Sequence, residues 1–201
     1  MTVLKLALSA SLTSLLLLSA CAKVQKIDMH NDTGAQVMAL DYRDFQQAAS
    51  EATQSMLKSP ALNIVNGKRH VLAISEVRND TMQHIDTDQL IKKIRIELLN
   101  SGKVFVTTAV GGAEDKMNQE SRDLRGNDEF NSVSIAKKGT LQAPDMSLSG
   151  KILQRNINMG DSKQQVEYYF MLTLTDLKNG LAVWEGESII GKRGSDKSVA
   201  W

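Results

Sequence analysis

The sequence predicts an α/β (α+β) fold with a small mixed sheet of about four to five strands and helices mainly on one side. Two patterns predict this fold. Between residues 41 and 106, stretches with helical spacing of apolar residues alternate with short apolar runs typical of strands. In the last third of the chain, apolar residues occupy every second position, as in antiparallel strands with one solvated face.

Composition narrows the class of protein. The 201 residues are enough for one domain at about 100–200 residues per domain. Lysine and arginine number 24 against 23 aspartate and glutamate, so the clustered basic excess of a nucleic-acid-binding protein is missing. A hydrophobic fraction of 42% excludes wholesale disorder. The single cysteine excludes an internal disulfide and a multi-cysteine metal cluster.

Residues 1–20 have the pattern of a secretory signal peptide. Lys5 is their only charged residue, and an uncharged, mostly apolar or small run extends from Leu6 to Ala20. This run is shorter than the roughly 20 apolar residues that cross a bilayer. A charged start, a short apolar run and small residues at its end predict cleavage rather than a membrane span.

The end of this segment matches the lipobox of bacterial lipoproteins, Leu18-Ser19-Ala20-Cys21, in which the cysteine takes a diacylglycerol before cleavage. The alternative is an ordinary signal peptide with a chance cysteine. Because the only cysteine occupies the motif position, we predict lipidation of Cys21, which anchors the chain through about 0.8 kcal/mol per buried methylene. Ala22, in place of an aspartate, favours the outer membrane, with the protein facing the periplasm.

Changes in pattern divide the mature chain into three segments. Residues 21–40 mix polar and small residues without periodicity and predict a short lipidated tether, with a turn-like cluster at residues 31–34. The nineteen residues after Cys21, residues 22–40, reach at most about 65 Å. Residues 41–193 carry the regular patterns and predict the globular domain, and residues 194–201 predict a loose C-terminal tail.

The globular segment begins with a predicted helix. An apolar stripe runs from Tyr42 to Met56, with polar residues opposite it. Asp41 is the expected N-cap. Ser59-Pro60 ends the helix, because the residue before a proline is pushed out of the helical region.

A strand and a second helix follow. The near-continuous apolar run within residues 70–77 predicts a strand buried on both faces, and Arg78-Asn79-Asp80-Thr81 predicts a loop after it. The second helix begins at Asp86 or Thr87. Gly102 lies where a glycine is expected past a helix C-terminus.

The second half of the chain changes character twice. Residues 104–106 predict a short strand, and the polar segment after it predicts two helices, around residues 113–124 and 128–138. The last third predicts a three-stranded antiparallel meander with turns at residues 160–162 and 178–180. One face of the hairpin is amphipathic, as expected if it is solvated or binds a partner; its residues are Glu167, Tyr169, Met171, Thr173 and Thr175.

Catalytic signatures are nearly absent from the sequence. His30, His70 and His84 are scattered, and no zinc-protease pair, serine-hydrolase elbow or phosphate-binding glycine loop occurs. Clustered carboxylates lie at predicted loop ends and helix starts, where capping and the helix dipole account for them. The sequence therefore predicts no enzyme, no metal site and no cofactor.

Several segments together resemble the LpoB-type lipoproteins, outer-membrane activators of bifunctional penicillin-binding proteins. After a lipobox, a tether and an amphipathic helix, residues 71–81 read VLAISEVRNDT and match the strand and N-x-T loop of that family. The similarity continues in LNSGKVF at residues 99–105 and in TDLKNG at residues 175–180. It covers roughly residues 41–192, and the order and spacing of the segments make it fairly specific.

This resemblance implies a fold like the N-terminal domain of TolB, no catalysis and no cofactor. It implies a monomer that docks on a non-catalytic domain of a class A penicillin-binding protein and stimulates peptidoglycan synthesis. The candidate contact residues are Arg78, Asn79, Asp80, Thr81, Tyr169 and Met171. A turn stabilised by the Asn79 and Asp80 side chains is the structural alternative for that loop. The short tether, without proline before Pro60, departs from the long proline-rich tethers of the family.

Two other functions are also compatible with the sequence. The first is a general envelope binding or assembly lipoprotein, such as a subunit of a curli-secretion-like or other outer-membrane complex, which predicts stable oligomers. The second is an enzyme that cleaves or remodels peptidoglycan, which predicts release of soluble fragments from purified sacculi. An aromatic content of only 4% is poor for a sugar-stacking cleft and disfavours the enzyme.

Overall fold

The computed structural model describes residues 26–29, 31–64 and 66–198. The predicted signal peptide at residues 1–20 and Cys21 lie outside the described residues. The compact unit that carries the sheet spans residues 36–201, and among the described residues the hydrophobic core side chains lie between Met38 and Ile190. A chain that starts at residue 22 therefore contains every core residue that the structure describes.

Helices and strands alternate in the order that the sequence predicts for the first half of the domain. The elements are α2 (Tyr42–Lys58), η1 (Pro60–Leu62), β1 (His70–Asp80), α3 (Asp88–Asn100), β2 (Val104–Val106), α4 (Lys116–Asp123), β3 (Met146–Gly160), β4 (Lys163–Asp176) and β5 (Leu181–Ser195).

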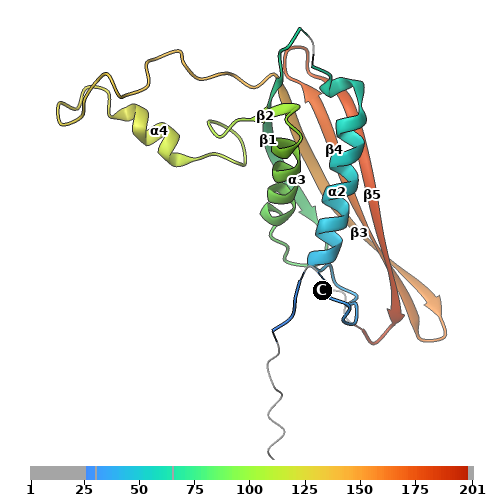
Figure 1. Cartoon of the computed structure of the whole chain (residues 1–201). Coiled ribbons are helices and arrows are strands. Elements are labelled where there is room, and N and C mark those ends of the chain that lie inside the picture. The colour runs from blue at the N-terminus through green and yellow to red at the C-terminus, as the bar shows by residue number, and fades with distance from the viewer. Residues whose placement is uncertain (1–25, 30, 65, 199–201) are drawn as a thin grey trace, which may run out of the picture. The chain divides into compact units, whose positions relative to one another are not determined.

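The five strands form one mixed sheet in the order β2-β1-β3-β4-β5. β1 pairs in parallel with β2 and β3, whereas β3, β4 and β5 form an antiparallel meander. Helices α2 and α3 pack on one face of this sheet, α2 against β5 and α3 against β2 (Figure 1). The predicted fold class, a mixed sheet with helices mainly on one side, is confirmed.

The predicted cap of α2 is present. The Asp41 carboxylate accepts hydrogen bonds from the amides of Arg43 and Asp44, and the Asp44 carboxylate accepts one from the Asp41 amide. This reciprocal capping box satisfies amides that a helix start leaves unpaired. The helix ends at Lys58, before Ser59, as predicted.

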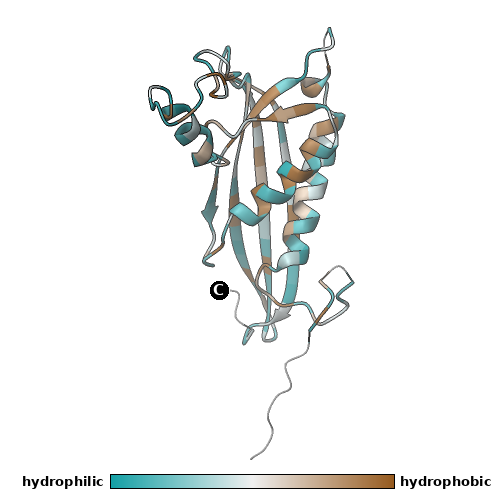
Figure 2. Ribbon diagram, turned by 60° about the vertical axis from the view of Figure 1, so that its left-hand side comes forward, coloured by the Kyte–Doolittle hydropathy of each residue, from teal (hydrophilic) through white to brown (hydrophobic). Residues whose placement is uncertain are grey.

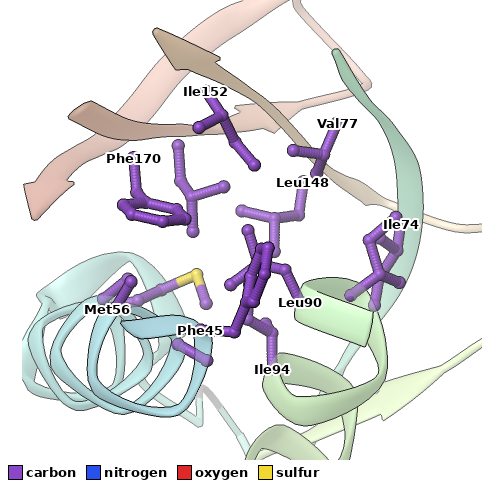
Figure 3. Close-up of a cluster of buried hydrophobic side chains, with 14 of the residues drawn as sticks. Phe45, Met56, Ile74, Val77, Leu90, Ile94, Leu148, Ile152 and Phe170 are labelled. Atoms are coloured by element: carbon purple, nitrogen blue, oxygen red, sulfur yellow. The ribbon is translucent and has the colours of Figure 1, made fainter. Parts of the chain in front are cut away.

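The core fills the space between the helices and the sheet. Phe45 and Met56 of α2, Leu90 and Ile94 of α3, and side chains from β1, β3 and β4 meet there (Figure 3). The rings of Phe45 and Phe170 meet edge to face, with centroids 6.0 Å apart. The strand residues that fill the core are the alternate apolar positions, and Figure 2 shows the corresponding change of hydropathy along the strands.

The predicted loop after β1 is wrong in part, because β1 continues through Asp80. An irregularity between Ile74 and Val77 places one extra residue in β1, so that Ile74 pairs with Leu148 and Val77 with Gly150. The bulge keeps both Ile74 and Val77 on the helix-covered face. It therefore moves Arg78 and Asp80 to the opposite, open face.

The segment between β2 and β3 lies beside the sheet and contains α4 (Figure 1). The second helix predicted there, at residues 128–138, is wrong: these residues form turns. The Asn127 side chain accepts a hydrogen bond from the Glu129 amide, and the Asn131 side chain accepts one from the Val133 amide. Such local hydrogen bonds favour turns over a helix. Val133 is 89% exposed, so no apolar stripe is buried that would stabilise a helix.

Both ends of the globular unit extend beyond the predicted limits. Residues 38–40 belong to the packed unit, since Met38 is buried and the carbonyl oxygens of Met38 and Ala39 accept hydrogen bonds from Tyr168 Oη and Lys192 Nζ. β5 continues to Ser195, past the predicted domain limit at residue 193. Long-range hydrogen bonds, which local composition does not reveal, hold residues 38–40 in place.

The side chains of Tyr168 and Lys192 hold residues 38–40 against the sheet through hydrogen bonds to their carbonyl oxygens. Burial, with a smaller effect of the Asp44 charge, raises the pKa of Tyr168 to about 12, so its hydroxyl stays protonated and donates to the Met38 carbonyl. Gln83 Nε2 donates to the same hydroxyl. Lys192 Nζ lies 2.5 Å from Asp44 Oδ2, and the Lys192 side chain is only 5% exposed.

The lowered pKa of the Asp41 carboxylate makes the stability of the fold depend on pH. Burial alone raises its pKa, but the hydrogen bond from Arg43 and the charge of Lys192 outweigh burial and hold the pKa below its ordinary value of 3.8. A lowered folded-state pKa stabilises the fold above the unfolded-state pKa, and that stabilisation disappears as the pH falls through the folded-state value.

We expect Asp41→Asn, which keeps an N-cap oxygen, to lower the free energy of unfolding by up to about 1 kcal/mol above about pH 5. The difference from wild type should close below about pH 3. Urea unfolding across this range measures it, with Asp128→Asn, at an exposed position between β2 and β3, as control. A difference that is constant with pH contradicts the assigned role of the charge.

Candidate functional site

The face of the sheet opposite α2 and α3 is uncovered over β3, β4 and β5. Its side chains are the alternate residues that do not enter the core. Among them, Met171 is 40% exposed and Ile189 52% exposed, and neither is covered by a helix. We call this surface, formed by Arg78 and Asp80 of β1 and by the outward-facing residues 149–155 of β3, 167–173 of β4 and 185–189 of β5, the open face.

Register places the open-face residues in rows across the strands, because directly opposed residues of neighbouring strands share a face. The rows, from β1 or β3 towards β5, are Arg78–Lys151–Met171–Glu187, Asp80–Leu153–Tyr169–Ile189, Ser149–Thr173–Glu185 and Arg155–Glu167.

The centre of the open face is apolar and its two sides carry opposite charge. Leu153, Tyr169, Met171 and Ile189 are neighbours in adjacent rows. Basic residues lie on the β1 and β3 side, where Lys151 Nζ pairs with Asp80 Oδ2 at 3.2 Å. Acidic residues lie on β5, where Glu185 and Glu187 flank a shallow hollow of about 310 Å³ that also touches Met171.

A hydrogen-bonded group orders one side of this centre. Tyr169 Oη donates to Glu167 Oε2 at 2.6 Å, and Gln165 Nε2 donates to Glu167 Oε1 at 2.7 Å. The hydrogen bond from Tyr169, followed by that from Gln165, lowers the pKa of Glu167, and the same bond to Glu167 raises the pKa of Tyr169. At neutral pH Glu167 is therefore ionised and holds the Tyr169 ring in one orientation.

The structure brings together four of the six predicted contact residues. Arg78 and Met171 lie in one row, with Lys151 between them, and Asp80 and Tyr169 lie in the next, with Leu153 between them. These four residues come from two predicted groups that are far apart in the sequence, and β3 joins them into one surface.

Asn79 and Thr81 do not belong to this surface. The Asn79 side chain accepts from the Thr81 amide and hydroxyl and donates to the Gln83 carbonyl, so it closes the turn after β1. The alternative interpretation of this loop, a turn stabilised by its own side chains, is therefore correct for Asn79. It does not describe Asp80, whose carboxylate pairs with Lys151.

Sequence reasoning missed the β3 and β5 residues of the open face, above all Lys151, Leu153 and Ile189. For Lys151 the signal was present: residues 146, 148, 150 and 152 alternate with more polar residues, so a core that takes the first set leaves Lys151 facing outward. What the alternation does not supply is which of these residues lie opposite Tyr169 and Met171.

The histidines and carboxylates do not assemble a catalytic centre in the described part of the chain. His70 Nδ1 lies 3.0 Å from Asp145 Oδ2, and His84 is exposed on the loop before α3. His30 lies outside the described residues. Across residues 26–29, 31–64 and 66–198, no group of three potential metal ligands is found, and no helix is both long and apolar enough to span a membrane.

Solved structures to which this chain is similar include three of LpoB. The C-terminal domains from Escherichia coli and Salmonella enterica are each 14% identical to this chain, with TM-scores of 0.43 and 0.42, and each match covers 73% of this chain and 98% of that domain. Lipoprotein GNA1162 from Neisseria meningitidis is 13% identical, with a TM-score of 0.34 and coverage of 63% and 84%. No sequence among the curated proteins matches significantly.

The fold is an α/β domain with helices on one side of its sheet and the open face on the other. The model of the family described as peptidoglycan-synthase activator LpoB matches residues 44–190. The chain belongs to this family, which confirms the predicted resemblance. Activation of a peptidoglycan synthase, a regulatory role rather than an enzymatic one, is thus its function at the level of the family.

Proposed function

We propose that this protein is a non-enzymatic regulator, anchored by lipid on Cys21 to the outer membrane and facing the periplasm. In this proposal it acts as a monomer that binds a class A penicillin-binding protein and stimulates peptidoglycan synthesis. Membership of the activator family supports the regulatory role. The lipobox and Ala22 support the anchor and the location.

The observation that carries the proposal is the joining of Arg78, Asp80, Tyr169 and Met171 into one uncovered surface. An apolar centre with charged residues around it is the usual arrangement of a protein–protein contact. Tyrosine, methionine and arginine are enriched in such contacts. Basic residues towards β1 and acidic residues on β5 give the surface a direction, so a partner with the complementary charge order docks in one orientation.

The test measures glycan-chain synthesis by purified class A penicillin-binding proteins with and without residues 22–201 of this chain. We expect faster polymerisation in the presence of the chain, and binding that saturates at equimolar amounts. Heat-unfolded chain at the same concentration is the control. If folded chain neither binds nor accelerates any class A synthase of the organism, the proposed function is wrong.

A further inference from the structure

A second surface lies at the end of the sheet where β1 and β2 begin and β4 ends. Residues 66–70, Asp145 and the turn after β4 meet there: the Asp145 amide donates to the Val71 carbonyl, and the Leu177 amide donates to the Asp145 carbonyl, each at 2.9 Å. Residues 38–40, the last residues of the predicted tether, pack against β5 at the opposite end of the sheet (Figure 1).

Two adjoining hollows open at this end and share Lys68 and Arg69. One, of about 250 Å³, is lined by Asn66, Lys68, Arg69, His70, Asp145 and Lys178. The other, of about 470 Å³, is lined by Gly67, Lys68, Arg69, Phe105 and Gln142. A ligand that spans both hollows therefore passes the same two cations.

The positive charges of Lys68, Arg69 and Lys178 around these hollows are not neutralised by Asp145, the acidic residue in their lining. Asp145 accepts the Val71 amide through Oδ1 at 2.8 Å and contacts His70 Nδ1 through Oδ2 at 3.0 Å. In the part of the chain that the structure describes, Lys68, Arg69 and Lys178 form no ion pair. In a chain of nearly zero net charge, this local excess attracts anions.

Arg69 is already oriented for binding. Its guanidinium lies over the Phe105 ring, 5.0 Å from the ring centroid. Stacking leaves the edge of the guanidinium free to form the paired hydrogen bonds that a carboxylate accepts. Asn66 and Gln142 add amide groups, one in each hollow, that can pair with peptide groups or sugar hydroxyls.

We propose that the two hollows bind carboxylate-bearing peptides of an anionic glycopeptide polymer, the chemistry of peptidoglycan stem peptides. The ligand enters a concave site with an arginine fork, two lysines and amides, which suits a short branched chain better than a flat lipid surface. This contact with the cell wall is separate from the open face and does not depend on binding to a synthase.

The test is co-sedimentation of residues 22–201 with purified sacculi. We expect retention that weakens as NaCl is raised from about 0.05 M to about 0.3 M. The variant Lys68→Gln, Arg69→Gln, Lys178→Gln should bind at least about tenfold more weakly. The matched control Lys116→Gln, Lys137→Gln, Lys138→Gln removes the same charge from exposed positions near α4 and should bind as wild type does.

Two further arms identify the ligand. Sacculi stripped of stem peptides by an amidase should lose most of the retention, because the carboxylates leave with the peptides. Vesicles that contain phosphatidylglycerol should bind weakly and equally in both triple variants. Retention that survives amidase treatment, equal losses in both variants, or a vesicle preference that depends on Lys68, Arg69 and Lys178 would each overturn the proposal. The synthase assay is unaffected by any of these results.

Discussion

Replacing Lys192 by methionine is expected to lower the free energy of unfolding by about 3–5 kcal/mol. Methionine fills a similar volume but leaves the buried Asp44 carboxylate without its cation. It also removes the hydrogen bond of 2.6 Å to the Ala39 carbonyl, one of the bonds that hold residues 38–40 against β5. Thermal and urea unfolding of residues 22–201 measure the loss.

A second substitution separates the charge effect from the loss of packing. Asp44→Asn removes the buried charge but keeps an oxygen that can accept the Asp41 amide. We therefore expect the double variant Asp44→Asn, Lys192→Met to be more stable than Lys192→Met alone. Lys163→Met, at an exposed position at the start of β4, should change stability by less than about 0.5 kcal/mol. A Lys192→Met protein as stable as wild type would show that the ion pair contributes nothing.

The second large effect is expected on the open face. Truncating both Tyr169 and Met171 to alanine removes the centre of the surface, and central aromatic residues of an interface each carry about 2 kcal/mol or more. We expect binding to the class A synthase to weaken by about 30-fold or more, with the stimulation of glycan synthesis lost at concentrations that saturate with wild type.

The matched control for this variant is Met117→Ala, Phe130→Ala. It removes a methionine and an aromatic ring that are 60% and 48% exposed in the segment between β2 and β3. This control should bind and stimulate as wild type does. Both variants should unfold cooperatively, since neither residue pair lies in the core. If the Tyr169, Met171 variant is folded and still stimulates fully, the open face is not the synthase contact.

The local amino-acid pattern was sufficient to predict those features of the fold that depend on residues close together in the chain. The Asp41 cap, the end of α2 before Pro60 and the glycine after α3 are where the sequence predicts them. Alternation in the last third correctly predicts which residues of β4 enter the core. The helix predicted at residues 128–138 does not form because a short helix is stable mainly where an apolar face is buried against the rest of the protein, and this polar segment has no such face.

The sequence by itself therefore determined the fold class, the family and the uncovered side of the meander. Tertiary structure alone decided that β1 continues past its bulge, that Arg78 lies in the row of Met171, and that Lys192 is buried beneath residues 38–40. Strand register and burial depend on contacts between residues far apart in the chain. One extra residue in a strand moves every later side chain to the other face, and no local pattern near Arg78 specifies that shift.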